Sequence, residues 1–354
     1  MHVSRLLQEW YAIYKRDLPW RETCDPYQIW LSEVILQQTR VMQGLEYYRT
    51  FIRLYPRVED LARAAPDDVL KTWQGLGYYT RARNLHETAQ YVATRLKGVF
   101  PGSYEELLKL KGIGKYSAAA IASIAFREPV AVVDGNVCRV LSRVFGIDLP
   151  VDSNRGKAVF YEKASEILDE ENPDIHNQAI MEFGALVCTP KNPNCRECPF
   201  TDNCVAYRTG RTGMLPVKTG KKQIRDRYFN YFHIMDHGHT WIGKRDRKDI
   251  WNSLYELPLI ETPGPCTWDE LSSTVLWRAI FGDTAIRVEL PAKHYTHKLT
   301  HQTIHCNIYR VIEPGSLPFT GYNLIKISIS DLSRYAIPRL LEKYLADLIQ
   351  ESRV

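Results

Sequence analysis

The chain has 354 residues, of which 45% are hydrophobic and 25% are charged, and its formal net charge is +5. This length allows two domains, and the composition excludes a disordered or fibrous protein. The positive charge permits binding to a polyanion without requiring it. The N-terminus lacks the apolar core of a signal peptide, and no apolar run approaches the ~20 residues of a membrane span. We therefore expect a cytoplasmic protein with no membrane partner.

The first hundred residues are expected to be mostly helical. Apolar residues at helical spacing predict a helix over 4–15, a second over 27–39, and two more within 57–97. Glu33 lies among bulky apolar residues in the second helix, and taken alone it is typical of a solvated or dipole-stabilising glutamate. The polar run at 37–40 is unusual in such an apolar helix, and amide side chains can hydrogen-bond base edges.

The stretch from Leu107 to Asn136 organises the first half of the chain. It reads LLKLKGIGKYSAAAIASIAFREPVAVVDGN. A short helix is expected to end before a tight hairpin closed by Gly112 and Gly114, where a missing Cβ permits positive φ. A second helix then starts near Tyr116. Backbone N–H groups at such a helix N-terminus bind anions such as a DNA phosphate. A strand-like run is expected to place Asp134 beside this phosphate-binding hairpin. Residues 134–187 are expected to be helical.

Four of the eight cysteines fall within residues 188–204, with the spacing C-x6-C-x2-C-x5-C. The others are scattered, which favours reduced thiols in an intracellular compartment. Four thiolates over so short a span are expected to converge on one centre. Zinc ribbons usually pair two CxxC knuckles across a longer gap, so the compact spacing favours an iron–sulfur cluster. The predicted ligands are Cys188, Cys195, Cys198 and Cys204.

The second half of the chain changes character. Residues 208–227 contain seven bases, one acid and several glycines, which is typical of a linker that follows the DNA backbone. From Tyr228 the apolar pattern has a period of two and predicts strands, followed by a helix over 268–281, a strand pair over 293–313 and a closing helix over 336–350. We expect a first domain at 1–207, a linker at 208–227 and an α+β domain at 228–354.

Several of these motifs occur together in a known family. LPWR…WLSEVILQQTRV, LxGxGxx[ST] followed by VDGNV, and the cysteine loop resemble the adenine DNA glycosylases, which are related to endonuclease III. The resemblance implies an all-α helix-hairpin-helix glycosylase domain with a [4Fe–4S] cluster loop, and an α+β Nudix-like C-terminal domain. The segment WDELSSTVLWRAIFG lacks the acidic Nudix catalytic box, so no pyrophosphatase site is expected. The implied cofactor is the [4Fe–4S] cluster, in a structural role.

The implied reaction is hydrolysis of the N-glycosidic bond of an adenine paired with 8-oxoguanine or guanine in double-stranded DNA, by a monomer. In this family Glu33 would be the general acid and Asp134 would stabilise the sugar cation, as in other two-carboxylate glycoside hydrolyses. Tyr116 and Asn136 match positions that orient this centre. The adenine pocket would consist of Arg16, Trp20, Arg21, Leu36 and Gln178. Contacts to the opposite base, the stack and the phosphates would come from Gln38, Thr39, Tyr78, Gly112, Gly114 and Lys115.

The family reads 8-oxoguanine with a Phe-Ser-His loop in the C-terminal domain. The best-matching tripeptide here is Leu299, Thr300 and His301. The segment 294–297, which reads HYTH, offers a second register. An ordinary hairpin with solvent-facing Thr and His is a further interpretation of the same residues.

Two alternative functions remain from the sequence. Bifunctional relatives carry a Lys where this chain has Tyr116, and that Lys forms a Schiff base that cuts the strand. Tyrosine has no amine, which disfavours a pyrimidine-lesion glycosylase/lyase of the endonuclease III type. A non-catalytic binder of damaged DNA is disfavoured by the presence of both Glu33 and Asp134.

Overall fold

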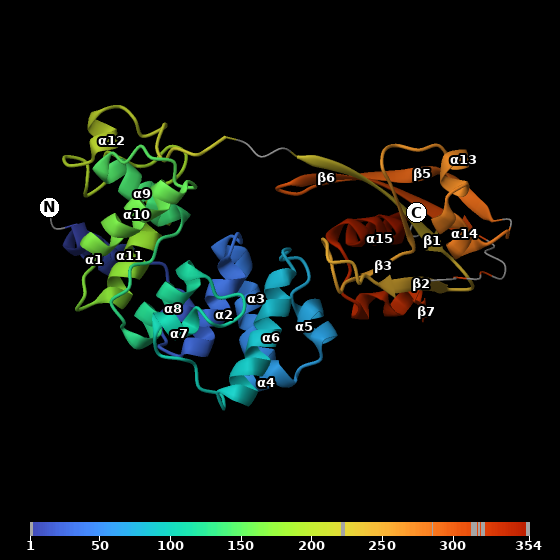
Figure 1. Cartoon of the computed structure of the whole chain (residues 1–354), viewed down its shortest axis with the longest axis horizontal. Helices are drawn as coiled ribbons and strands as arrows, with labels where there is room; N and C mark the ends of the chain where they lie inside the picture. Colours follow the sequence, from blue (N-terminus) through green and yellow to red (C-terminus); the bar gives the residue numbers. More distant parts are fainter. Residues whose placement is uncertain are drawn as a thin grey trace. The chain divides into compact units, whose positions relative to one another are not determined.

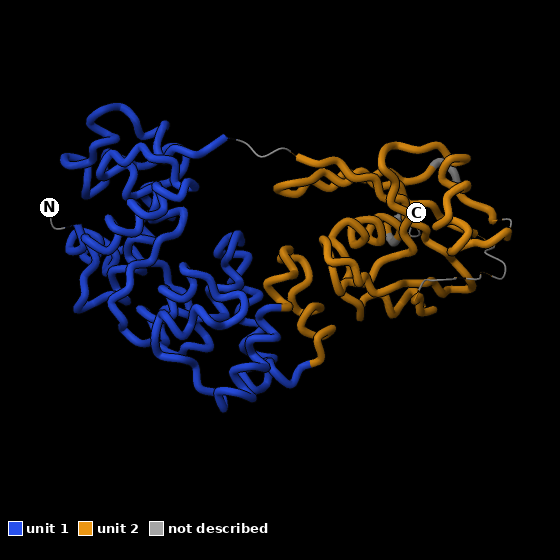
Figure 2. Tube along the Cα trace, viewed as in Figure 1, with its two compact units in different colours: residues 1–64, 84–220 blue, residues 65–83, 221–354 orange. Residues whose placement is uncertain are grey.

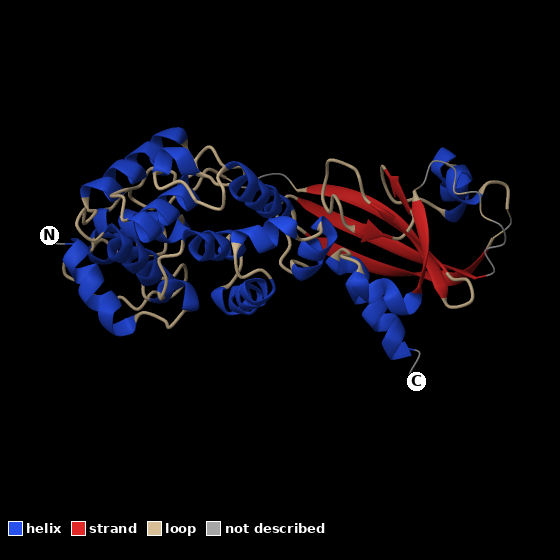
Figure 3. Ribbon diagram, turned by 90° about the horizontal axis from the view of Figure 1, so that it is seen from below, coloured by secondary structure: helices blue, strands red, loops and turns tan. Residues whose placement is uncertain are grey.

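The computed structural model of the chain describes residues 3–220, 224–284, 286–312, 317, 319 and 323–351. It divides into two compact units, one formed by residues 1–64 and 84–220 and the other by residues 65–83 and 221–354 (Figure 2). The first unit is helical, and the second combines strands with helices (Figure 3). No helix among the described residues is both long and apolar enough to cross a membrane.

The helical unit is built around α1, α9 and α11, whose buried faces share one apolar core with Leu7, Leu141 and Phe183 at its centre (Figure 1). In the same unit, α2 packs against α8. The helices of this unit are α1 (Val3–Tyr14), α2 (Pro26–Leu36), α3 (Val41–Leu54), α4 (Val58–Arg63), α6 (Thr80–Arg95), α7 (Tyr104–Leu107), α8 (Lys115–Phe126), α9 (Gly135–Phe145), α10 (Asn154–Glu166), α11 (Pro173–Leu186) and α12 (Val205–Arg208).

Two helix predictions differ in detail from this arrangement. The helix predicted over 27–39 ends at Leu36, and Gln38 has a φ of +56°, so the polar run forms a turn instead of a last helical turn. Residues 57–97 contain three helices and not two. Pro66 begins α5 (Pro66–Thr72), and Gly75 and Gly77, with φ of +98° and +72°, separate it from α6.

The hairpin between α7 and α8 needs glycine at one of its two positions. Gly112 has a φ of +77°, and a Cβ there would lie 2.7 Å from the Asn84 Cβ. Gly114 is the N-cap of α8 with a φ of −92°, so the expectation of positive φ was wrong for this residue. The run before Asp134 was also predicted incorrectly, because it pairs with no strand in the part of the chain that the structure describes. Instead the Asn177 side chain accepts from the Val132 N–H at 3.0 Å and donates to the carbonyl of residue 130 at 2.8 Å.

The second unit contains two sheets, with strand orders β4-β1-β6-β5 and β3-β2-β7. β1 runs parallel to β6, and β5 and β6 form an antiparallel hairpin. Helices α13 and α14 cover one face of the larger sheet. They replace the single helix predicted over 268–281, because Thr274 caps a new helix. The strands are β1 (Arg225–Ile234), β2 (His239–Lys244), β3 (Tyr255–Glu256), β4 (Leu259–Thr262), β5 (Arg287–Lys298), β6 (Gln302–Ile312) and β7 (Leu324–Ser328), and the helices are α5, α13 (Trp268–Ser272), α14 (Val275–Phe281) and α15 (Arg339–Glu351).

The predicted basic linker is only partly a free segment. Leu215 is buried in the helical unit, and the carbonyl of Val217 accepts from the Val151 N–H at 3.0 Å. At the other end, Arg227 lies inside β1 and is buried against carboxylates, so the expectation that it contacts DNA phosphates was wrong. Lys221 and Lys222 lie outside the described residues.

Candidate active site

A cavity of about 190 Å³ in the helical unit brings together the residues that the family resemblance implied. Its walls come from the loop before α2, from α2 itself, and from α8, α9 and α11. Thr39 also lines this cavity. The predicted catalytic and adenine-binding residues on its surface are Arg16, Trp20, Arg21, Glu33, Leu36, Tyr116, Asp134, Asn136 and Gln178.

Glu33 is a buried acid. It lies in α2, which is apolar on nearly all sides, and only 7% of the residue is exposed. Burial raises the pKa of its carboxyl to about 7, the nearby charge of Asp134 adds to this, and a hydrogen bond with Tyr116 acts in the opposite direction. Its Oε2 atom has no hydrogen-bond partner among the described residues. Glu33 can therefore hold a proton at neutral pH and has a free oxygen to present it.

Asp134 is held in one orientation at the N-terminus of α9. Its Oδ1 accepts from the Val137 N–H at 2.7 Å, and its Oδ2 accepts from the Asn136 side chain at 2.8 Å. Burial raises the pKa of Asp134, while these two donors and the charge of Arg139 favour the anion. The positive end of the helix dipole favours the anion as well. The carboxylate therefore faces the cavity as a fixed acceptor.

Glu182 is the residue of this site that sequence reasoning missed. Its Oε1 accepts from Nε of Arg16 at 2.8 Å and from Nη1 of Arg21 at 2.9 Å, while its Oε2 accepts from Nη2 of Arg21 at 2.7 Å. Burial alone would raise the pKa of Glu182, but the hydrogen bonds from both arginines lower it to about 2. A signal was available, since Glu182 lies four residues after Gln178 and so on the same helical face.

Two arginines of α9 connect this site to the cysteine segment. They are Arg139 and Arg143, and both side chains are buried. Arg139 donates to Oδ1 of Asn136 at 2.8 Å and to the carbonyl of Cys188 at 2.6 Å. Arg143 donates to the carbonyl of Thr189 at 2.7 Å and lies 3.5 Å from the Cys188 sulfur. The helix that carries Asp134 thus also positions the first cysteine.

The four clustered cysteines line one apolar pocket, together with Phe183 and Phe200. Within the described part of the chain, no group of three or more His, Cys, Asp or Glu side chains is placed to hold a single metal ion. An iron–sulfur cluster is held by thiolates alone and places them on different irons, so it does not require them to meet at one ion. The donor set and its apolar walls fit such a cluster better than a single zinc ion.

The residues expected to contact DNA lie on both units. In the helical unit, Gln38, Gly112, Gly114 and Lys115 are exposed on two turns. In the second unit, Tyr78 is 47% exposed, has a φ of +46°, and its hydroxyl lies 2.8 Å from Oγ1 of Thr300.

Residues 299–301 form the turn between β5 and β6 (Figure 1), with Leu299 half-buried and Thr300 and His301 exposed. The alternative register at 294–297 lies within β5 and not in the turn.

Two known families match the chain. Residues 31–157 match the family described as HhH-GPD superfamily base excision DNA repair protein, and residues 230–347 match the NUDIX domain. An adenine DNA glycosylase of Buchnera aphidicola (subsp. Baizongia pistaciae) is 33% identical over 343 residues, which is 96% of this chain and 94% of that protein. The chain belongs to the adenine DNA glycosylase family. It is therefore an N-glycosylase of base excision DNA repair, and the expected two-part fold is confirmed.

Other relatives match a smaller share of the chain. The adenine DNA glycosylase of Mus musculus is 42% identical over 229 residues, which cover 62% of this chain and 44% of that protein. The solved structure of a thermostable thymine-DNA glycosylase matches with a TM-score of 0.54 and 29% identity. The match covers 58% of this chain and 95% of the chain of that structure. A similar fold therefore occurs in a glycosylase named for a different base, so base specificity must come from individual side chains.

Proposed function

We propose that this glycosylase, acting as a monomer, removes adenine paired with 8-oxoguanine or guanine in double-stranded DNA, with Glu33 as the general acid and Asp134 as the electrostatic stabiliser. One observation supports these roles above all others. Glu33 and Asp134 line the same cavity, and their surroundings differ. Glu33 has apolar neighbours and an unpartnered oxygen, whereas both oxygens of Asp134 accept hydrogen bonds. Such a difference separates an acid from an anion.

The mechanism follows from these two environments. The target adenine must leave the base stack to enter the cavity. Intact adenine is a poor leaving group, so the Glu33 proton is transferred to a ring nitrogen as the glycosidic bond breaks. Positive charge develops on the sugar, and the Asp134 carboxylate stabilises it. Glu33, now an anion, accepts a proton from the attacking water. Tyr116 lies beside Glu33 in the cavity wall, and the Asn136 side chain donates to Asp134, which keeps the Asp134 carboxylate in its orientation.

The identity of residue 116 predicts the product. Tyrosine cannot form a Schiff base, so the DNA strand is expected to stay intact after adenine is released. The test uses a duplex with one adenine opposite 8-oxoguanine, scored for free adenine and for strand breaks before and after hot alkali. Breaks are expected only after alkali. Efficient trapping of a protein–DNA adduct by borohydride would support the lyase alternative.

We propose a [4Fe–4S] cluster as the cofactor, held by the four clustered cysteines. Bound there, the cluster supplies a rigid cross-link for residues 188–204, and the chemistry at adenine needs no step from it. Replacing Cys198 by Ser is expected to lose the bound iron and to weaken DNA binding, because the segment loses its anchor. Cys24→Ser is the matched control, since Cys24 is exposed and is not one of the four proposed ligands. About one zinc and no iron per anaerobically purified protein would contradict the assignment.

We propose that the turn at 299–301 reads the base opposite adenine, with Tyr78, Gln38 and Thr39 contributing from their exposed turns. Adenine is a normal base, so selectivity must come from its partner. The combined change Thr300→Ala and His301→Ala is expected to lower the preference for 8-oxoguanine over guanine by about 1–3 kcal/mol, a typical loss for base-edge contacts.

The control for this change is His294→Ala with Thr296→Ala, two exposed residues of β5 outside the turn. Single-turnover rates on both mispairs give the preference. An unchanged preference in the turn variant, with a loss in the control, would place the reader in the second register.

A further inference from the structure

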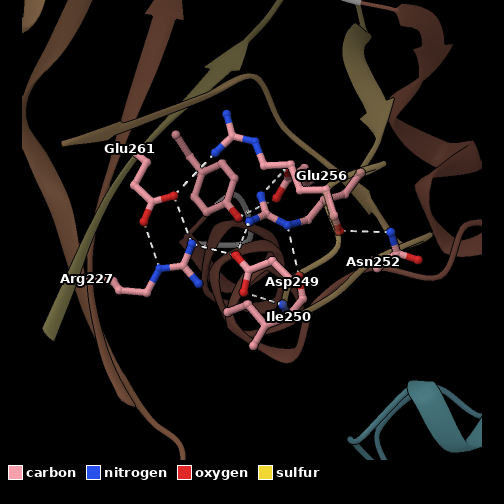
Figure 4. A network of polar contacts seen from close by, with 9 residues as sticks. Arg227, Asp249, Ile250, Asn252, Glu256 and Glu261 are labelled. Carbon is pink, nitrogen blue, oxygen red and sulfur yellow. Dashed lines mark hydrogen bonds and ion pairs between the residues drawn. The ribbon is translucent and has the colours of Figure 1, made fainter. Parts of the chain in front are cut away.

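The second unit contains a network of charged side chains that takes no part in the proposed reaction (Figure 4). Arg227 donates to both carboxylate oxygens of Glu261, at 2.7 and 2.8 Å, and its Nη2 lies 2.6 Å from Oδ2 of Asp249. Arg245 donates to Oε1 of Glu256 at 2.8 Å and to the same Asp249 oxygen at 3.0 Å. The two arginine side chains are only 7% and 1% exposed. Asp249 thus joins two buried arginines.

This network holds the loop of residues 246–254, which connects β2 to β3. Arg245 Nε donates to the carbonyl of Ile250 at 2.9 Å, and Asp249 accepts from the Ile250 N–H at 2.6 Å. The next residues have an unfavourable backbone, since Trp251 and Ser253 have φ of +59° and +68°. Bulky residues seldom adopt such angles unless their surroundings enforce them. The conformation of the loop therefore depends on the arginines and on Asp249.

The loop 246–254 contacts two segments that carry proposed DNA-reading residues. The Trp251 ring lies 5.8 Å from the ring of His297, two residues before the turn at 299–301. The carbonyl of Asn252 accepts from Nη1 of Arg83 at 2.6 Å, and Nη2 of Arg83 donates to the Thr80 hydroxyl at 2.9 Å. Thr80 follows Tyr78 by two residues. One loop therefore supports the segments that carry Tyr78 and Thr300.

Stability alone is a poor explanation for this network. Buried ion pairs often contribute no more than apolar side chains of the same size, because desolvation offsets their attraction. Buried ion pairs can instead restrict the side chains and backbone that they join to a single arrangement. The hydrogen bond between Tyr78 and Thr300 spans 222 residues of sequence and requires both segments to be in register.

We infer that the network of Arg227, Asp249 and Arg245 positions the loop 246–254 so that Trp251 and the Asn252 carbonyl align the Thr300 turn with Tyr78 for reading the base opposite adenine. Trp251 and Asp249 are positioning residues in this arrangement and act through Thr300 and Tyr78. The inference rests on the proposed function, because it assigns the loop a role in discrimination and not in adenine release.

The first experiment is Trp251→Ala in the full-length protein. Small displacements of a reading group have large effects, so the preference for 8-oxoguanine over guanine is expected to fall on the order of tenfold to a hundredfold. The rate on adenine opposite guanine should stay close to wild type. The matched control is Trp277→Ala. Trp277 is equally buried, at 8% exposure, but packs against Phe232 and Phe281 in the core between α13, α14 and the larger sheet. Trp277→Ala should lower the stability and keep the preference for 8-oxoguanine. Trp251→Phe should retain most of the preference that Trp251→Ala loses.

The second readout needs no DNA. Amide hydrogen exchange at residues 78–80 and 297–303 is expected to accelerate in Trp251→Ala and in Asp249→Asn, but not in Trp277→Ala or in Asp331→Asn, which changes a surface ion pair. Wild-type exchange at these residues in Trp251→Ala, or a retained preference for 8-oxoguanine, would overturn the inference. Failure of the proposed function would look different, because the wild-type protein itself would release no adenine.

Discussion

Replacing Glu33 by Gln is expected to lower the rate of adenine release by about 10²–10⁴-fold, the usual contribution of a general acid. Gln keeps the size of the side chain and cannot supply the proton. DNA binding should be nearly unchanged, since the residue is buried at the cavity and does not lie on the turns proposed to contact DNA. Single-turnover rates and duplex affinity measure the two effects separately. Glu22→Gln, at an exposed position nearby in the sequence, is the control. Excision by Glu33→Gln within tenfold of the wild-type rate would remove Glu33 from the role of acid.

The same residue predicts how activity and stability change with pH. Only the protonated form acts as the acid, so the wild-type rate should fall as pH rises above the Glu33 pKa of about 7. The folded protein holds this proton more tightly than the unfolded chain does. Stability therefore falls as pH rises from about 4.5 to about 7, by up to roughly 3 kcal/mol. Glu33→Gln stays neutral throughout, so its melting temperature should exceed that of wild type at pH 8 and match it at pH 4.5.

Much of the fold could be predicted from apolar spacing, and the failures have local causes. α1 and the β5–β6 hairpin lie where the pattern placed them, because each buries one regular face. The run before Asp134 has the composition of a strand but no partner strand among the described residues, and it is held by the Asn177 side chain, 45 residues after Val132. The early end of α2 depends on the left-handed Gln38, and that conformation leaves no apolar pattern to detect.

In the site, too, residues that belong to local sequence motifs could be predicted, whereas contacts between residues far apart in the sequence could not. Family motifs identified Glu33 and Asp134, and the structure places both on one cavity. Buried polar partners were harder to predict, because their environment depends on contacts far apart in sequence. Arg227 was assigned to a basic linker from its neighbours, while its carboxylate partners follow 22 and 34 residues later. A run of basic residues in the sequence predicts the average charge of the segment, but it does not show which basic side chain is buried against carboxylates.

The second large effect is expected at Glu182, whose side chain is 1% exposed and whose partners Arg16 and Arg21 both line the same cavity as Glu33. Removing the carboxylate in Glu182→Ala leaves two partly buried guanidinium groups without their anion. The expected loss is about 3–5 kcal/mol of unfolding free energy at pH 7. Glu46→Ala, which removes an exposed ion pair with Arg49, should change stability by no more than about 0.5 kcal/mol.

The pH dependence identifies the cause of that loss. Because the folded-state pKa of Glu182 lies near 2, below its ordinary value, its ionised form contributes stability above about pH 4.5 and loses it as pH falls toward 2. The difference between wild type and Glu182→Ala should therefore be constant from pH 7 to pH 5 and shrink below that, in urea unfolding followed by circular dichroism. Adding Arg21→Met to Glu182→Ala should recover part of the stability, since one unpaired charge is removed with it. A difference that stayed constant down to pH 3 would mean that the alanine variant loses packing and not charge.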